Sequence, residues 1–251
     1  MITNTGLVDA NPLASISKAF ESPKKVTMPT LVPSQLPDLM FAIANASIKR
    51  TTRCLIEWQL HTMTRPSEAA GTRWDEIDLD KGIWLIPPER MKKKRPHSIP
   101  LSPQAIQLLD VMKPISEKRE HVFPADRNPR EHTHQQTVNM ALKRMGFAGM
   151  LVAHGLRALA STTLNEKGFD PDIIEAALAH SDKNDVRAAY NRAEYLERRR
   201  EMMDWWSMFI YKSGIGNLSV NQRPKLSTCQ HPKTFQFSDL SGSHFIAEIT
   251  C

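Results

Sequence analysis

The stretch Ala153-His154-Gly155-Leu156-Arg157-Ala158 is the most informative part of this chain. If this stretch is helical, His154 and Arg157 stand three residues apart and project from one face. A guanidinium group offers a planar fork of donors that suits one phosphate group, and an imidazole beside it can handle a proton. The pair alone is a weak signal, because any helix surface can carry it by chance, so its weight depends on the rest of the chain.

Three further features accompany this pair. Upstream, Arg65 stands in Thr64-Arg65-Pro66-Ser67-Glu68, and the basic run Glu89-Arg90-Met91-Lys92-Lys93-Lys94-Arg95 follows it. Downstream, His180 is followed by Tyr190. A tyrosine supplies a nucleophile that can form a covalent ester with a phosphate, so the ordered set indicates chemistry on a phosphodiester.

The composition favours a polyanionic partner. The chain of 251 residues has a formal net charge of +6, and its 41% hydrophobic content is enough to bury a core. A positive balance most simply indicates nucleic acid. Three cysteines, Cys54, Cys229 and Cys251, lack metal-type spacing and form no even disulfide framework, which is typical of a reducing cytoplasm.

The sequence shows no sign of membrane insertion or secretion. No apolar run reaches the roughly 18 residues that a membrane span requires. The first residues lack the charged and apolar regions of a signal peptide. We therefore expect a soluble intracellular protein with no membrane partner.

The pattern of apolar residues predicts a mainly helical α+β fold with a small antiparallel sheet. Helical periodicity begins near Leu36, and apolar residues of the segment 52–63 fall on one helical face. Residues 82–87 and 97–101 read as strands that flank the basic run, so Lys92 is predicted to lie on the connection of a β-hairpin.

Later helices carry clear start signals. Ser102-Pro103 and Asp170-Pro171 each place a capping side chain before a proline at the first helical position. A helix is also predicted from about Thr137, and a last one over residues 194–211. The apolar stripe of that last helix, with Trp205 and Trp206, is interpreted as core packing rather than base stacking.

These signals divide the chain into three parts. Residues 1–35 carry several prolines and are predicted to be a linker that a further segment normally precedes. Residues 36–212 are predicted to form the catalytic domain. Residues 213–251 shift to a polar composition without sustained periodicity and are predicted to be a poorly ordered tail.

The side chains of this set suit one reaction. A tyrosine can attack phosphorus and leave a phosphotyrosine and a free 5′-hydroxyl, and another hydroxyl can later displace it. Two arginines can stabilise the negative charge of the transition state. A lysine can protonate the departing oxygen and a histidine can accept the tyrosine proton. Because guanidinium groups supply the charge, the set requires neither a metal nor a cofactor.

In these motifs the chain resembles the tyrosine recombinases, specifically the integrases of satellite phages and genomic islands. The likeness runs roughly from Asn11 to Tyr211. The motifs that carry it are residues 56–68, 89–102, 122–124, 153–158, 178–180 and 190–196. It implies site-specific DNA recombination, the integration or excision of a mobile element, through a 3′-phosphotyrosyl intermediate.

The resemblance also implies a role for each residue of the set. It assigns phosphate clamping to Arg65 and Arg157, general acid catalysis to Lys92, proton handling to His154, a hydrogen bond to the scissile phosphate to His180, and nucleophilic attack to Tyr190. Lys93, Lys94 and Arg95 are interpreted as contacts to DNA phosphates. The expected partners are a double-stranded attachment site and other integrase protomers on DNA.

Several residues have competing interpretations. Tyr195 is the rival nucleophile, although helical geometry turns it away from the face of Tyr190. His97 is expected to make a cross-strand or backbone-capping bond rather than act in catalysis. His132 and His134 have no carboxylate or cysteine at metal-ligand spacing, so a solvated loop is expected there.

Two alternative functions stay open at this point. A type IB topoisomerase-like activity shares the same chemistry without pairing two DNA sites. A catalytically silent DNA-binding fragment is the other, because full-length family members carry further DNA-binding modules ahead of the catalytic domain. Fewer neutralised phosphates weaken binding steeply.

Overall fold

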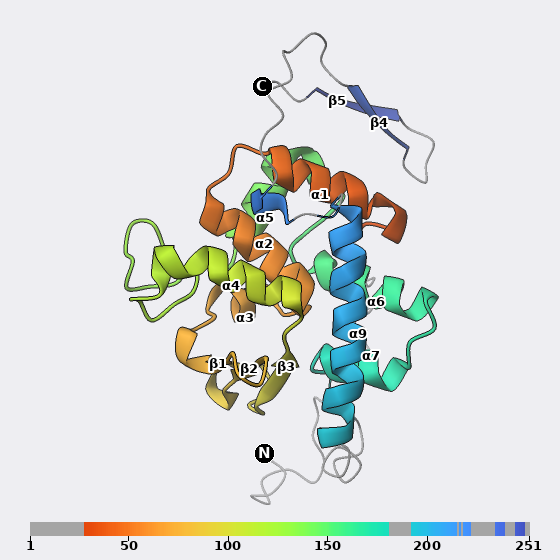
Figure 1. The fold of residues 1–251 in the computed structure, drawn as a ribbon. Helices are drawn as coiled ribbons and strands as arrows, with labels where there is room; N and C mark the ends of the chain where they lie inside the picture. The colour runs from red at the N-terminus through yellow and green to blue at the C-terminus, as the bar shows by residue number, and fades with distance from the viewer. Residues whose placement is uncertain are drawn as a thin grey trace, which may run out of the picture.

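The computed structural model describes residues 28–180, 192–214, 216, 218–221, 234–238 and 244–248. Helices dominate these residues, and a three-stranded sheet lies at one end of the helical body (Figure 1). This arrangement confirms the predicted mainly helical fold with a small antiparallel sheet. The elements up to the sheet are η3 (Pro33–Gln35), α1 (Leu36–Asn45), α2 (Arg50–Thr62), α3 (Pro66–Ala70), η4 (Trp74–Glu76), β1 (Ile77–Asp78), β2 (Ile83–Ile86), η5 (Pro88–Arg90) and β3 (His97–Pro100).

The remaining elements are helical apart from one pair of strands. They are α4 (Pro103–Ser116), α5 (Thr137–Leu142), the π-helical turn η6 (Lys143–Phe147), α6 (Gly155–Glu166), α7 (Pro171–Ala177), α9 (Arg192–Ser213), η7 (Ser219–Asn221), β4 (Thr234–Ser238) and β5 (His244–Glu248). Strands β4 and β5 pair with each other in antiparallel register.

The sheet has one buried face. Its order is β1-β2-β3, and Trp84 on β2 pairs with Ile99 on β3 in the antiparallel hairpin that the sequence predicts. Trp84 and Ile86 are buried while Leu85 between them is half exposed, which follows from the two-residue alternation of a strand. The buried face therefore points into the helical body, and the connection between β2 and β3 is left at its margin.

Helix α2 forms the centre of the core. Its apolar Ile56 and Leu60 are fully buried, as the helical face predicted from the sequence requires. Trp58 on the same helix packs against Trp84 with ring centroids 5.2 Å apart, and its indole N–H donates to Thr72 Oγ1 at 3.0 Å. This cluster joins the sheet to the helices.

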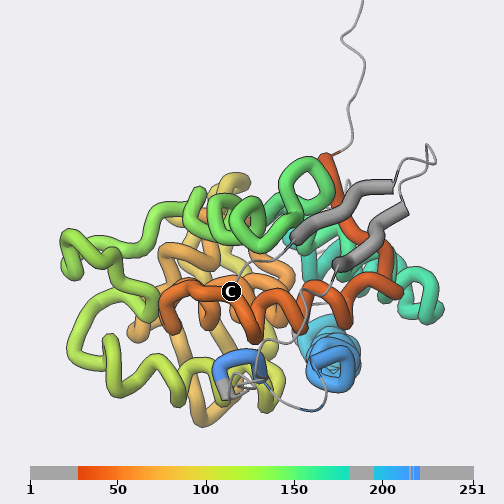
Figure 2. Tube along the Cα trace, turned by 90° about the horizontal axis from the view of Figure 1, so that it is seen from above, coloured from red at the N-terminus to blue at the C-terminus, as the bar shows by residue number. Residues whose placement is uncertain are grey.

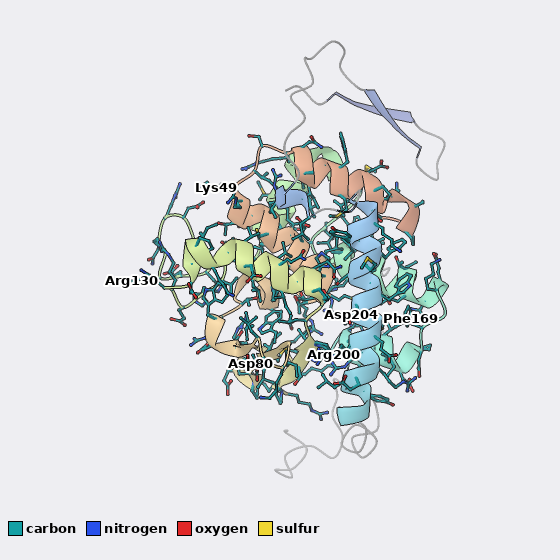
Figure 3. All side chains as sticks on the ribbon, in the orientation of Figure 1. Lys49, Asp80, Arg130, Phe169, Arg200 and Asp204 are labelled. Atoms are coloured by element: carbon teal, nitrogen blue, oxygen red, sulfur yellow. The ribbon has the colours of Figure 1, made fainter. Side chains whose placement is uncertain are left out.

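Helix α9 runs beside the body, contacting β3 at one end and α1 at the other, and Figure 2 shows it nearly end-on. Trp206 is buried and its indole N–H donates to the Leu60 carbonyl at 2.8 Å. At the sheet end, Arg200 donates to the carbonyls of Lys81 and Gly82, both at 3.3 Å (Figure 3). These contacts confirm that the apolar stripe of the last helix is core packing.

The predicted helix starts are also present. Ser102 Oγ accepts from the Ala105 amide at 3.3 Å ahead of α4. Asp170 accepts from the Asp172 amide at 2.9 Å ahead of α7. Both caps satisfy an amide that has no partner inside its helix.

The segment before α1 packs against the start of α6. Thr30 Oγ1 donates to the Gly155 carbonyl at 2.8 Å, and Leu31 is buried. A side chain at Gly155 would collide with the Pro29 carbonyl, so this approach depends on glycine.

The predicted limits of linker, domain and tail stay predictions, because residues 1–27 and much of 213–251 lie outside the described residues. Among the described residues, no helix is both long and apolar enough to cross a membrane.

Candidate active site

Arg65 lies at the junction between α2 and α3. It precedes Pro66, the first residue of α3, and Glu68 in the first turn is almost fully buried. The Glu68 carboxylate accepts from the Arg65 amide at 2.9 Å and from Arg65 Nη1 at 2.7 Å. Glu68 therefore caps the short helix and fixes the orientation of the guanidinium, whose side chain stays 17% exposed.

Arg157 comes from the first turn of α6 and is only 4% exposed. Its Nη1 donates to the Met63 carbonyl, and its Nη2 donates to the Leu178 carbonyl at 2.6 Å. Burial first, and the Arg65 charge second, lower the pKa of Arg157 to about 10. The group is still protonated at neutral pH, and the two bonds leave further N–H donors for an anion.

The two guanidinium groups lie close enough to repel each other. The Arg65 charge lowers the pKa of Arg157 as well as that of His154. Two cations in a partly buried site are unfavourable unless an anion lies between them. Glu68 offsets part of this repulsion, and a phosphate would offset more.

His154 is the N-cap residue of α6, and its side chain is exposed. Partial burial is the main cause that holds its pKa below the ordinary value, and Arg157, Arg65 and His180 add to the effect. The imidazole is therefore neutral near pH 7 and able to accept a proton. These causes also show that His154 lies among the two arginines and His180.

The turn that follows α7 determines the position of His180. Ala179 adopts a left-handed conformation with φ of 50°, and the amides of Ala179 and His180 bond back to the carbonyls of Ala176 and Glu175. This is a Schellman arrangement with alanine where glycine is usual. The His180 Nδ1 then pairs with Glu175 Oε2 at 2.7 Å, which leaves Nε2 available to a ligand as far as the described residues are concerned.

The structure thus brings four of the six residues predicted to be catalytic, Arg65, His154, Arg157 and His180, into one cluster. Lys92 lies on the exposed connection between β2 and β3, as predicted. Among the described residues, its side chain makes no hydrogen bond or ion pair with that cluster. Its role as general acid therefore stays a prediction.

The neighbouring cations of the connection are also exposed. Lys93, Lys94 and Arg95 follow Lys92, and Lys94 has a positive φ of 52°. The Lys94 ammonium donates to the Glu89 carbonyl at 3.1 Å, which closes the turn on itself. Their proposed contact with DNA phosphates is likewise untested.

The predicted nucleophile, Tyr190, lies outside the described residues, which omit 181–191. Its rival Tyr195 lies on α9, where its carbonyl accepts from Arg199 Nε at 3.2 Å. The choice between the two tyrosines stays a prediction.

His97 has the backbone-capping role expected from the sequence. It is buried on β3, and its Nε2 donates to the carbonyl of Ala177, the last residue of α7, at 3.2 Å. Burial first, then the nearby arginines, lower its pKa to about 3, so it is neutral. His97 supports the turn whose next carbonyl, that of Leu178, holds Arg157.

Sequence reasoning missed the roles of Glu68 and Met63. A local signal existed for Glu68, because glutamate in the first turn after a proline is a common capping residue. No local signal exists for Met63, whose carbonyl holds Arg157 from a left-handed position with φ of 53°.

A family model described as the phage integrase family matches residues 29–197. The chain belongs to the phage integrase family. The chain is 54% identical over 223 residues to prophage integrase IntA of Escherichia coli strain K12, an alignment that covers 89% of this chain and 54% of the relative. It is 36% identical over 219 residues to the integrase of Enterobacteria phage P4, covering 81% of this chain and 50% of that relative. The chain thus spans about half the length of the curated relatives it matches.

Solved structures share the fold of this chain. The integrase from mycobacterium phage Brujita matches with a TM-score of 0.56 at 21% identity, over 83% of this chain and 71% of that one. A lambda integrase dimer bound to a COC′ core site matches with a TM-score of 0.54 at 22% identity, over 71% of this chain and 66% of that one. At these identities the likeness concerns the fold.

Proposed function

We propose that this integrase cleaves and rejoins DNA at specific sites through a 3′-phosphotyrosyl intermediate, integrating or excising a mobile element. The observation that carries the proposal is the pair of fixed guanidinium groups, Arg65 held by Glu68 and Arg157 held by two backbone carbonyls. Two fixed cations in one cluster are an arrangement that stabilises a phosphoryl-transfer transition state. Membership of the phage integrase family supports the same activity.

The proposed step balances without a metal or a redox partner. Tyr190 Oη forms a bond to phosphorus while the bond from phosphorus to the 5′ oxygen breaks. The tyrosine proton passes to neutral His154, and Lys92 gives a proton to the departing 5′ oxygen. Arg65, Arg157 and His180 donate to the non-bridging oxygens. A 5′-hydroxyl from another strand reverses the step and rejoins the DNA.

The proposed partners are duplex DNA carrying an attachment site and further integrase protomers. A net charge of +6 and the exposed Lys93, Lys94 and Arg95 favour DNA. Related solved structures include a lambda integrase dimer bound to a core site and a lambda integrase tetramer bound to a Holliday junction. We expect this chain to work in the bacterial cytoplasm, where its DNA substrate is.

A covalent trapping experiment tests this function and identifies the substrate. The 251-residue chain is incubated with a pool of randomised duplexes that carry a nick, so that cleavage releases a short fragment and traps the enzyme on DNA. Protein-linked DNA that survives denaturing detergent is then sequenced. We expect one enriched sequence, joined to protein through Tyr190.

The remaining outcomes separate the alternatives. DNA retention without any adduct would indicate a silent DNA-binding fragment and overturn the proposed cleavage. Adduct formation and relaxation of supercoiled plasmid without exchange between two trapped sites would indicate a topoisomerase-like activity. Exchange of strands between two copies of the trapped sequence is the result expected for a recombinase.

A further inference from the structure

Arg90 lies at the base of the connection that carries Lys92, and its guanidinium points into the protein. It is the last residue of η5, and its side chain is 20% exposed. Its Nη1 pairs with the carboxylate of Glu76, and its Nη2 donates to the Glu68 carbonyl at 2.7 Å. Because both ends of its fork are occupied by protein acceptors, Arg90 is anchored in the fold rather than offered to DNA.

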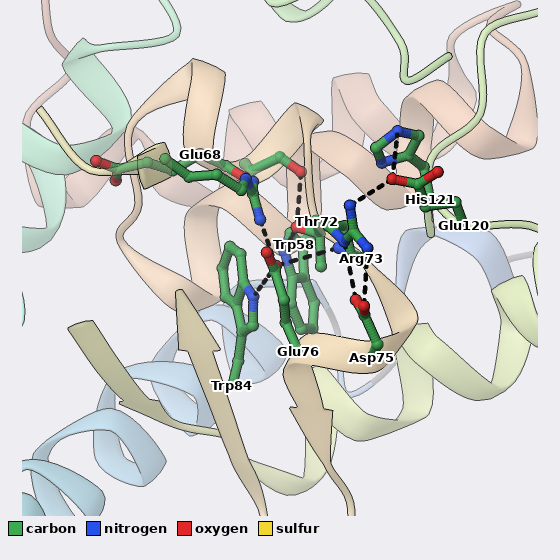
Figure 4. A network of polar contacts seen from close by, with 11 residues as sticks. Trp58, Glu68, Thr72, Arg73, Asp75, Glu76, Trp84, Glu120 and His121 are labelled. Atoms are coloured by element: carbon green, nitrogen blue, oxygen red, sulfur yellow. Dashed lines mark hydrogen bonds and ion pairs between the residues drawn. The ribbon is translucent and has the colours of Figure 1, made fainter. Parts of the chain in front are cut away.

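One oxygen of the acceptor Glu76, Oε2, is the point on which three donors converge. Figure 4 shows Glu76 between Trp84 and Arg73, and its Oε2 accepts from the Trp84 indole at 3.0 Å and from the Arg73 amide at 3.2 Å. Its side chain is 6% exposed. A buried carboxylate with these donors is a fixed point, so the Arg90 side chain that pairs with it is fixed as well.

A glycine makes room for this guanidinium. A Cβ added to Gly71 would lie 2.9 Å from Arg90 Nη2 and 3.3 Å from the Ser67 carbonyl. Real side chains do not approach that closely, so any larger residue at position 71 would push Arg90 away from Glu68. The position of the Arg90 guanidinium therefore depends on its two acceptors, Glu76 and Glu68, and on the absence of a side chain at Gly71.

Arg90 connects two parts of the proposed active site. Glu68 holds Arg65 through its carboxylate and holds Arg90 through its carbonyl. The next residue after Arg90, Met91, is buried, and Lys92 is the first exposed residue that follows. The chain is thus anchored two residues before Lys92, on the same helix turn that orients Arg65.

We propose that Arg90 is a positioning residue that sets where Lys92 stands relative to Arg65, through its paired contacts with Glu76 and Glu68. The proposal rests on the proposed function, in which Lys92 protonates the departing oxygen. A displacement of about 1 Å in a catalytic group costs on the order of 100-fold in rate. Loss of the anchor should therefore impair proton delivery while the arginine clamp is retained.

The test compares two leaving groups on the DNA duplex that the covalent trapping experiment identifies. One substrate has the ordinary 5′ oxygen at the cleavage site, and the other has sulfur there. A thiol has a pKa of about 8.5, so a sulfur leaving group departs without a proton. We expect Arg90→Lys, which keeps the charge but loses the fork, to cleave the oxygen substrate roughly 10- to 100-fold more slowly. With the sulfur substrate it should cleave within about threefold of the parent chain.

The matched control is Arg73→Lys. Arg73 belongs to the same network, but its side chain pairs with the exposed carboxylates of Asp75 and Glu120, and only its amide contacts Glu76. It should cleave both substrates like the parent. Gly71→Ala keeps every charge and presses most closely on the Arg90 guanidinium, with the Ser67 carbonyl next. It should slow cleavage of the oxygen substrate less than Arg90→Lys does, and the sulfur substrate should restore the rate in the same way. If circular dichroism shows that Arg90→Lys is unfolded, the Gly71→Ala variant is used for the comparison instead.

Two results would overturn the inference about Arg90. An equal loss on both substrates would mean that Arg90 supports the fold or the clamp rather than Lys92. An unchanged cleavage rate of Arg90→Lys on the oxygen substrate would mean that Arg90 does not position Lys92. If the parent chain forms no adduct on either substrate, or if Lys92→Ala is not rescued by sulfur, the proposed function or its general acid fails instead.

Discussion

Arg157 donates to the backbone carbonyl of Met63, a residue 94 positions away in the chain. Met63 presents this carbonyl from a left-handed conformation, φ 53°, directly after α2 ends. Arg65 follows two residues later, so one tight turn carries the first arginine and holds the second. This relationship explains why the two cations lie in one cluster.

The first prediction concerns the geometry of the clamp. Arg157→Lys should slow cleavage by about 100-fold or more, because one ammonium cannot replace the fork that bonds Met63, Leu178 and a phosphate. DNA retention in a filter assay should change only a few-fold. Arg130→Lys, on the exposed loop labelled in Figure 3, is the matched control and should cleave like the parent. Parent-like cleavage by Arg157→Lys would contradict a clamp.

The second prediction concerns the nucleophile. Tyr190→Phe should abolish the covalent adduct and leave DNA binding unchanged, because only the hydroxyl that attacks phosphorus is removed. Tyr195→Phe should form the adduct at the parent rate. Mass spectrometry of the nuclease-trimmed adduct identifies the modified tyrosine directly. A nucleotide found on Tyr195 would reverse the assignment.

The third prediction follows from the lowered pKa of His154. The neutral ring is the one that accepts a proton, so cleavage should stay level as pH falls to about 6.5, the ordinary value for histidine, and decline only below it. The measurement is the single-turnover rate between pH 5 and pH 8. His154→Gln should be slower throughout and lose this decline, whereas His180→Gln should keep it. A midpoint above 6.5 in the parent chain would refute the base role.

The fourth prediction concerns metal dependence. Cleavage should proceed at the same rate in excess chelator, because the charge on the phosphate is offset by Arg65 and Arg157 rather than by a cation. The rate is compared with and without EDTA, and then with added magnesium. A rate that is lost in EDTA and restored by magnesium would point to a different, nuclease-type reaction.

The fifth prediction concerns stability and pH at Glu57. This carboxylate on α2 is fully buried and accepts from the amide and hydroxyl of Ser219, which lies beyond α9. Burial raises its pKa to about 7. A raised pKa means that the folded state binds the proton more tightly, so this contribution to stability is present below pH 4.5 and is lost as pH rises through 7.

Glu57→Gln isolates this effect. The variant cannot ionise, so its free energy of unfolding relative to the parent should rise between pH 5 and pH 8, by roughly 2–4 kcal/mol. Comparison at each pH is necessary because the buried His61 and His97, with pKa values lowered to about 3, act in the opposite direction below pH 6.5. Urea unfolding followed by tryptophan fluorescence measures the difference. A difference that does not change with pH would contradict a buried, titrating Glu57.

Much of the fold could be predicted from local signals. The hairpin around the basic run, the caps at Ser102 and Asp170, and the buried stripe of α9 all depend on residues a few positions apart. Such signals are strong because helical and strand periodicity, capping and proline placement act within one or two turns of chain. The set Arg65, His154, Arg157 and His180 is predicted in a different way, from the chemistry of its side chains and from the resemblance of its motifs to the tyrosine recombinases.

Only the tertiary structure decided which groups hold these residues in place. The partner of Arg157 is a carbonyl in a strained turn, the partner of Glu57 lies 162 positions away, and Arg90 reaches Glu68 and Glu76 across the base of the hairpin. Backbone carbonyls are identical in every residue, so no sequence pattern marks the one that accepts a given donor. Their selection follows from burial, because each buried polar group requires a partner and the packed chain determines which partner is near.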